Sequence, residues 1–142
     1  MLYSPAQERR VISGQGNILV MDDEEMVREV LGTMLVNLGY EVRFAQDGAQ
    51  AIKLFSKARE NGGAFDAVIL DLTVPGGMGG KETIEKLLQI DPQVKAIVSS
   101  GYSDDPIMAN FKECGFSEVL AKPYKVVDLS KILQRVIAKQ GD

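Results

Sequence analysis

Polar and charged side chains stand directly after four short apolar runs of the sequence. Asp22 and Asp23 follow NILVM, Asp71 follows AVIL, Ser100 closes KAIVSS, and Lys122 follows EVLA. Carboxylates that converge repel one another unless a cation neutralises them, and an all-oxygen ligand set suits Mg²⁺. A hydroxyl can donate to a phosphoryl oxygen, and a lysine can pair with a carboxylate or with an added phosphoryl group. These residue types together suit a site that holds Mg²⁺ and a phosphoryl group.

Each of these residues also has a simpler structural explanation when it is taken alone. Asp22 or Asp23 could cap a following helix, and Asp71 could hydrogen-bond to its own backbone in a turn. Ser100 could belong to a turn before glycine, and Lys122 could be an ordinary solvated lysine. The combination of all of them at strand ends is what indicates a site.

Five strand–helix pairs are predicted along the chain. The runs NILVM, AVIL and KAIVS are nearly all apolar, which is typical of strands covered on both faces. Strands that alternate with helices indicate an α/β fold with a parallel sheet, whose ligands bind beyond the carboxyl ends of the strands. The strands are expected at 17–21, 40–45, 67–70, 95–99 and 118–121, and the helices at 22–38, 48–59, 81–88, 105–113 and 126–138.

The composition limits both the domain count and the chemistry. The 142 residues suit one domain, predicted at 17–142, and residues 1–16 lack periodicity and are predicted to be a tail or linker. A net charge of −4 argues against a nucleic-acid groove. The absence of histidine excludes Ser-His-Asp triads and HExxH zinc sites, and one cysteine, Cys114, excludes intramolecular disulfides. No apolar stretch is long enough for a membrane helix or a signal peptide, so a cytoplasmic location is expected.

The set of motifs resembles the receiver domains of two-component response regulators. The likeness covers Asn17 to about Lys139 and rests on DD after the first strand, LDLTVPGGMGG, VSSG and KPY, in the family's order. It implies a doubly wound, flavodoxin-like (βα)5 fold with strand order 2-1-3-4-5. The glycine-rich loop GGMGGKE most resembles receivers attached to hybrid sensor histidine kinases.

The resemblance implies a role for each matching residue. Asp71 resembles the phosphoacceptor, Lys122 the lysine that contacts the phosphoryl group, and Ser100 the hydroxyl residue that moves on phosphorylation. Asp22 and Asp23 resemble the acidic pair that, with Asp71 and the backbone carbonyl of Thr73, binds Mg²⁺. The implied partner is a sensor histidine kinase or a histidine phosphotransfer protein. On this hypothesis the domain is a self-modifying switch and not an enzyme that turns over a diffusing substrate.

Some positions depart from the family pattern or lead to further predictions. Receivers often carry an aromatic residue three positions before the lysine, where this chain has Val119, so a conformational change cannot run through that ring. Receivers usually have a cis bond at the position of Lys122–Pro123, which is therefore predicted to be cis. Tyr102 lies where receivers often tune hydrolysis, and it could shield the acyl phosphate from water or contact a partner.

Three other functions remain open at this point. A phosphatase of the haloacid dehalogenase type would use a strand-end Asp nucleophile, but its second Asp is replaced here by Thr73. A flavodoxin-like cofactor module would need phosphate-binding donors where this chain has DDEE. A receiver fold could also bind partners without being phosphorylated.

Overall fold

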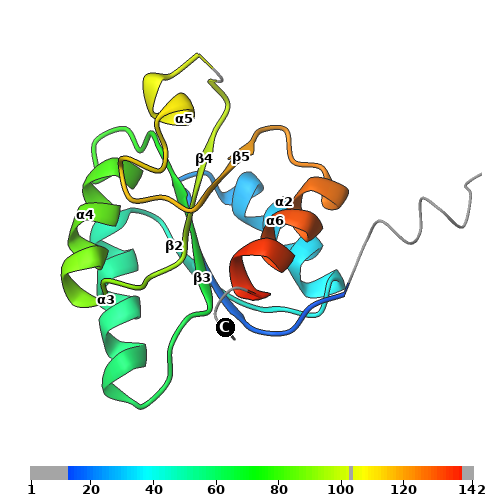
Figure 1. Ribbon diagram of the computed structural model, residues 1–142, viewed down its shortest axis with the longest axis horizontal. Coiled ribbons are helices and arrows are strands. Elements are labelled where there is room, and N and C mark those ends of the chain that lie inside the picture. Colours follow the sequence, from blue (N-terminus) through cyan, green and yellow to red (C-terminus); the bar gives the residue numbers. More distant parts are fainter. Residues whose placement is uncertain (1–12, 103, 139–142) are drawn as a thin grey trace, which may run out of the picture.

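The computed structural model describes residues 13–102 and 104–138, and within these ranges five strands alternate with five helices (Figure 1). The strands are β1 (Asn17–Met21), β2 (Glu41–Ala45), β3 (Ala67–Asp71), β4 (Ala96–Ser100) and β5 (Glu118–Ala121). The helices are α2 (Glu25–Asn37), α3 (Gly48–Glu60), α4 (Gly80–Ile90), α5 (Pro106–Ala109) and α6 (Val126–Ala138). The predicted alternation and the α/β class are confirmed.

The strands form one parallel sheet in the order β2-β1-β3-β4-β5, as predicted. In its register, Asp71 lies opposite Ser99, and Ser100 lies opposite Ala121. All five residues of β3 and all five of β4 are buried, as expected for central strands with helices on both faces. The register therefore brings the ends of β3, β4 and β5 to one edge of the sheet.

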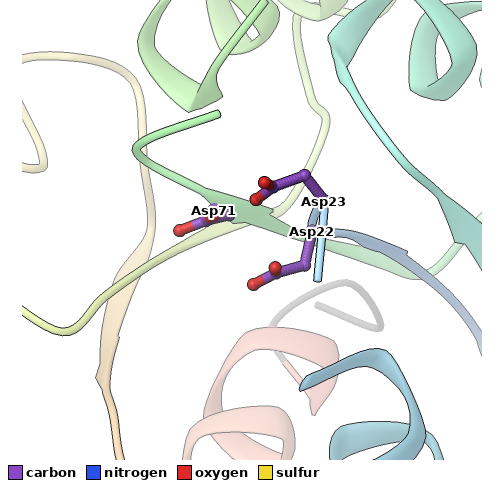
Figure 2. Close-up of side chains that lie close together, drawn as sticks. All are labelled: Asp22, Asp23 and Asp71. Carbon is purple, nitrogen blue, oxygen red and sulfur yellow. The ribbon is translucent and has the colours of Figure 1, made fainter. Parts of the chain in front are cut away.

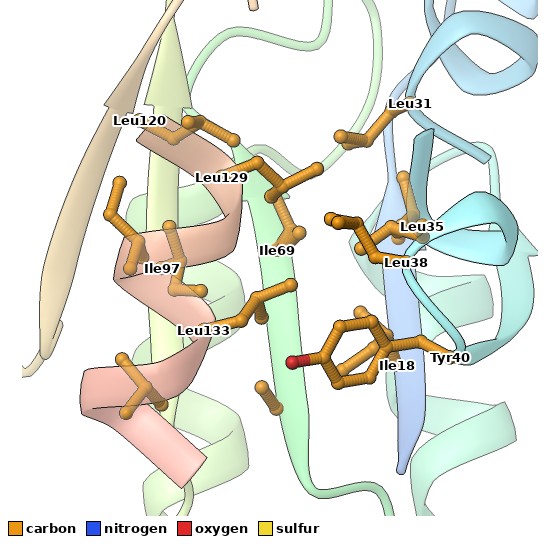
Figure 3. Packing of buried hydrophobic residues seen from close by; sticks show 14 residues of the cluster. Ile18, Leu31, Leu35, Leu38, Tyr40, Ile69, Ile97, Leu120, Leu129 and Leu133 are labelled. Carbon is orange, nitrogen blue, oxygen red and sulfur yellow. The ribbon is translucent and has the colours of Figure 1, made fainter. Parts of the chain in front are cut away.

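Helices cover the two faces of the sheet and enclose two separate cores. On one face, α2 and α6 pack their leucines, among them Leu35 and Leu133, against Ile69 and its neighbours in the central strands (Figure 3). On the other face lie α3 and α4, with Phe55 and Leu87 fully or almost fully buried (Figure 1). Each such side chain contributes about 1.5 to 3 kcal/mol through the apolar surface it removes from water. The two cores fix the sheet on which the polar edge is built.

Helix α5, at Pro106–Ala109, is shorter than the helix predicted at 105–113. The start of the helix is stabilised, because Pro106 occupies its first turn and the Asp105 carboxylate accepts a hydrogen bond from the backbone N–H of Ile107 at 3.0 Å. It ends at Ala109 because none of its residues is buried, and so short a helix has little packing to stabilise it. The following residues, 110–115, form turns instead.

The predicted tail, residues 1–16, lies mostly outside the described residues, as does the end of the predicted domain, 139–142. The described part of the tail, 13–16, contacts the fold. Gly14 donates its backbone N–H to the carbonyl of Leu38 at 2.7 Å, and Gly16 accepts from Glu41 at 2.8 Å. The side chain of Gln134 in α6 donates to the carbonyl of Ser13 at 3.3 Å.

Candidate functional site

Three carboxylates meet at the carboxyl edge of the sheet. Asp71 ends β3, while Asp22 and Asp23 directly follow β1, the neighbouring strand. Figure 2 shows their side chains gathered beside the end of β3, and one carboxylate oxygen of each lies within 4.8 Å of the others. Asp22 is 2% exposed and Asp71 5% exposed, whereas Asp23 faces solvent. The predicted acidic cluster is thus brought together by the fold.

Lys122 contacts the two buried carboxylates of this cluster. Its Nζ atom lies 2.9 Å from Oδ2 of Asp22 and 3.5 Å from Oδ1 of Asp71. Burial acts to lower the pKa of Lys122, but the hydrogen bond to Asp22 and the nearby negative charges outweigh it, so this pKa lies above its usual range. Lys122 therefore remains a cation at any physiological pH.

The same surroundings raise the pKa of Asp71, whereas a salt bridge usually lowers the pKa of a carboxylate. Burial, followed by the negative charge of Asp22, raises the pKa of Asp71 to about 6, and these effects exceed the lowering by Lys122 and by a hydrogen bond from the backbone of Thr73. Asp71 is mostly ionised at neutral pH. Its anionic form is held at a free-energy cost that a bound cation would relieve.

Asp22 combines a structural and an electrostatic role. Its Oδ1 atom accepts from the backbone N–H of Glu24 at 2.9 Å, and its carbonyl accepts from the Arg28 side chain at 2.7 Å. Glu24 itself occupies the cap position of α2 and makes no side-chain cap. The simpler explanation, that Asp22 caps the helix, is therefore wrong, because Glu24 holds the cap position. Asp22 orders the segment before the helix through its bond to Glu24, and its second oxygen points to Lys122.

The glycine-rich loop after Asp71 packs against the backbone of the strand end. A methyl group at Gly79 would lie 2.5 Å from the carbonyl oxygen of Leu72, and one at Gly80 would lie 2.9 Å from the carbonyl oxygen of Asp71. The hydroxyl of Thr83 donates to the carbonyl of Gly79 at 2.7 Å and fixes the turn into α4. Glycine is needed here because the loop passes too close to the backbone for any side chain.

Ser100 and Tyr102 line a pocket together with Asp71 and Lys122. The pocket has a volume of about 410 Å³, and its lining includes Asp71, Thr73, Ser100, Tyr102 and Lys122. The backbone N–H of Tyr102 donates to the hydroxyl oxygen of Ser100 at 3.0 Å, and the Tyr102 side chain is 66% exposed. The predicted site residues that line this pocket are Asp23, Asp71, Thr73, Ser100 and Lys122. Asp22 does not line it and joins the site through the acidic cluster.

Two further observations bear on the sequence predictions. The Lys122–Pro123 peptide bond is cis, as predicted. Val119 pairs with Val98 in the sheet and packs at the border of the core on the α3 and α4 face.

Sequence reasoning missed Tyr124, whose hydroxyl lies 2.7 Å from that of Ser99. The KPY motif and the doubled serine of VSSG were the signals that could have found it.

The donor set of the acidic cluster fits a magnesium ion. Three carboxylates with oxygen atoms this close, two of them buried, form an all-oxygen site with a net negative charge even after Lys122 is counted. Mg²⁺ prefers such hard ligands and keeps part of its water shell, which the exposed position of Asp23 allows. In the described part of the chain, no helix is both long and apolar enough to cross a membrane.

Comparison with known proteins decides the family. The family model described as the response regulator receiver domain matches residues 18–134. The chain belongs to this family. It is a receiver domain of two-component signalling, and the function and fold predicted from its motifs are confirmed. Receiver domains are phosphoacceptor switches that interact with histidine kinases or phosphotransfer proteins and bind Mg²⁺ at an acidic pocket.

Similar proteins of this family differ in length. The receiver domain is 28% identical over 120 residues to sporulation initiation phosphotransferase F of Bacillus subtilis, covering 84% of this chain and 92% of that protein. It is 29% identical to sensor kinase CckA of Brucella abortus over 95% of this chain but only 14% of the kinase. The chain thus spans a small part of some relatives and nearly all of others.

A solved structure gives the same fold with a metal in place. The receiver domain of sensor histidine kinase PA1611 from Pseudomonas aeruginosa, crystallised with magnesium coordinated in its active-site cleft, superposes with a TM-score of 0.76. It is 28% identical, and the match covers 88% of this chain and 99% of that one. The occurrence of sensor kinases among the relatives agrees with the likeness seen in the glycine-rich loop.

Proposed function

We propose that Asp71 accepts the phosphoryl group in this receiver domain. The observation that carries the proposal is the position of its buried carboxylate, which shares one pocket with Lys122 and Ser100 and lies beside Asp22 and Asp23. A strand end holds the nucleophile rigidly, and the glycines Gly79 and Gly80 let the following loop pack closely against the backbone of that strand end.

The reaction is an in-line transfer from a phosphohistidine of a partner protein. A carboxylate oxygen of Asp71 forms the new bond to phosphorus, the P–N bond to the partner's imidazole breaks, and its electron pair stays on the ring nitrogen. Lys122 offsets negative charge on the equatorial oxygens, for which its persistent positive charge suits it. The acyl phosphate is later hydrolysed, which returns the switch to its starting state.

Asp22, Asp23 and Asp71, with the backbone carbonyl of Thr73, are the groups we propose as the magnesium ligands. When bound, Mg²⁺ supplies positive charge for the transferring oxygens. The raised pKa of Asp71 supports this assignment, because a cation here would remove the repulsion from Asp22 that contributes to it.

Ser100 provides the link from the phosphoryl group to the rest of the domain. Its hydroxyl oxygen accepts from the backbone of Tyr102, so a movement of Ser100 toward a phosphoryl oxygen breaks or drags this contact. The displaced residues would be those that directly follow Ser100, with α5 behind them. Because α5 is short and buries none of its residues, it resists such a displacement weakly.

The partner that we propose is a sensor histidine kinase or a histidine phosphotransfer protein, and the expected location is the cytoplasm. A receiver that binds partners without phosphorylation is the alternative. The geometry favours the phosphorylated form, because a binding module would gain nothing from burying Asp22 and Asp71 beside each other at the cost that their repulsion imposes.

Phosphorylation with a small donor tests the proposal. Incubation with acetyl phosphate and Mg²⁺ should add one phosphoryl mass to the wild-type protein and to Asp128→Ala, which removes an exposed carboxylate of α6. Asp71→Ala should gain none. Phosphorylation of Asp71→Ala would assign the acceptor elsewhere, and no incorporation by the wild type would favour the phosphorylation-independent module.

A further inference from the structure

Tyr124 and Ser99 form a partly buried hydrogen bond between their side chains, next to the proposed phosphorylation site. Tyr124 lies in the segment between β5 and α6, two residues after Lys122, and its hydroxyl is 2.7 Å from that of Ser99. Ser99 is 1% exposed and immediately precedes Ser100. The link therefore joins the segment that carries Lys122 to the strand end that carries Ser100.

The backbone around Ser99 holds the ends of three strands together. The carbonyl of Ser99 accepts from the N–H of Leu72, the residue after Asp71, at 2.9 Å, and the carbonyl of Ser100 accepts from the N–H of Lys122 at 3.0 Å. Ser99 also lies opposite Asp71 in the register of the sheet. A side chain that binds Ser99 thus acts on the junction between the acceptor strand and the lysine segment.

Packing by itself does not account for the hydroxyl of Tyr124. The ring packs at the edge of the core between the sheet and the helices α2 and α6, and a phenylalanine would fill the same space. A hydroxyl shielded from water is costly unless it finds a partner, and here the half-buried Tyr124 hydroxyl pairs with that of the buried Ser99, which also needs one.

Tyr124 cannot act as a base or as a second anion in this site. Burial raises the pKa of Tyr124 to about 12, and its hydrogen bond to Ser99 and the charge of Lys122 only partly oppose this rise. The hydroxyl therefore remains neutral, and it acts on the site only through its hydrogen bond to Ser99.

We propose that Tyr124 is a positioning residue, whose hydroxyl bond to Ser99 holds Lys122 in place between Asp22 and Asp71. The Nζ atom of Lys122 must remain close to both carboxylates, and its long side chain has several rotatable bonds. Anchoring the backbone two residues further along limits where that side chain can reach. The inference rests on the proposed function, because the position of Lys122 matters for catalysis only if Asp71 is the acceptor.

Removing the hydroxyls one at a time tests this role kinetically. Tyr124→Phe should slow phosphorylation of Asp71 by acetyl phosphate at saturating Mg²⁺ by roughly tenfold, as expected when a catalytic group loses its fixed position. Ser99→Ala should give the same loss, and the double variant no further loss, because both changes break one contact.

Tyr40→Phe is the matched control for a general effect on stability. Tyr40 is a buried tyrosine of the same core, 4% exposed, and its hydroxyl bonds to Gln134 at the opposite end of the sheet. It should lower the thermal midpoint about as much as Tyr124→Phe while it leaves the phosphorylation rate unchanged. Equal phosphorylation rates for Tyr124→Phe and Tyr40→Phe would overturn the proposal.

A second readout does not depend on phosphorylation. The side-chain NMR signal of Lys122, assigned through Lys122→Arg, should move toward that of a free lysine in Tyr124→Phe and remain in place in Tyr40→Phe. An unmoved signal in Tyr124→Phe would overturn the positioning role even if the kinetics changed. If the wild-type protein took up no phosphoryl group at all, the proposed function would fail, and the lysine signal would still decide whether Tyr124 fixes Lys122.

Discussion

The Nζ atom of Lys122 lies 2.9 Å from Oδ2 of Asp22, although 100 residues separate the two in the sequence. Its distance to Asp71 is longer, 3.5 Å. The lysine therefore pairs most closely with the carboxylate next to the proposed acceptor. Asp71 keeps a pKa of about 6, because burial and the charge of Asp22 outweigh this more distant cation. This arrangement leads to the first prediction.

The stability of the metal-free domain should fall as the pH rises through the range in which Asp71 titrates and should level off above it. The pKa of Asp71 is about 6 in the folded state and 3.8 for an unperturbed Asp, so between these values the folded state binds more protons. Asp71→Asn should therefore be more stable than the wild type near pH 7.5 by about 1 to 3 kcal/mol, and equal to it near pH 4. Urea unfolding with a chelator present measures both. Equal stability of the two proteins at the higher pH would contradict the prediction.

Magnesium affinity should depend on Asp23 and not on the neighbouring glutamate. Asp23 contributes the exposed carboxylate of the cluster, whereas Glu24 lines the same pocket but is not among the three clustered carboxylates. Asp23→Asn should weaken Mg²⁺ binding by more than about tenfold, because one ligand and one charge are lost. Glu24→Gln removes the same charge one residue away and should change it far less. Titration calorimetry compares them, and a larger loss in Glu24→Gln would place the metal elsewhere.

A methyl group at Gly79 should disturb the loop that supports Asp71. The φ angle of Gly79 is −90°, which alanine also adopts, so the variant tests the close approach to the Leu72 carbonyl together with the smaller cost of alanine at the N-cap of α4. Gly79→Ala should destabilise the fold by about 1 to 3 kcal/mol, as overpacking usually does. Gly63→Ala is the control, since its methyl group would meet only the carbonyl oxygen of Ala58, at an ordinary contact distance of 3.5 Å. Chemical denaturation of both variants checks this, and similar midpoints would refute the steric explanation.

The ring of Tyr102 should shield the acyl phosphate from water. Tyr102 lines the pocket beside Ser100, and its side chain projects far enough to be 66% exposed. Tyr102→Ala should speed the decay of phosphorylated Asp71 by more than about twofold, which corresponds to about 0.4 kcal/mol on the barrier. Tyr102→Phe keeps the ring and should decay like the wild type. A rate in Tyr102→Ala within twofold of the wild type would leave contact with a partner as the role of this residue.

The sequence by itself determined the alternation of strands and helices and the identity of the polar edge. Apolar runs such as AVIL and the helical spacing from Met26 to Leu38 are local signals. They predict the folded structure correctly because the apolar residues that make the pattern are the ones buried in the two cores. A residue that directly follows a buried parallel strand must emerge at its carboxyl edge. Asp71 and Lys122 could therefore be placed together without coordinates.

Only the tertiary structure decided the features that depend on distances between segments far apart in the chain. The end of α5 at Ala109 follows from its lack of buried residues, which a helical pattern does not reveal. The closer approach of Lys122 to Asp22 than to Asp71, and the bond between Tyr124 and Ser99, depend on the strand register and on how the segment after β5 folds back. Differences of a few tenths of an ångström decide such contacts, and residue types and spacing carry no information at that scale.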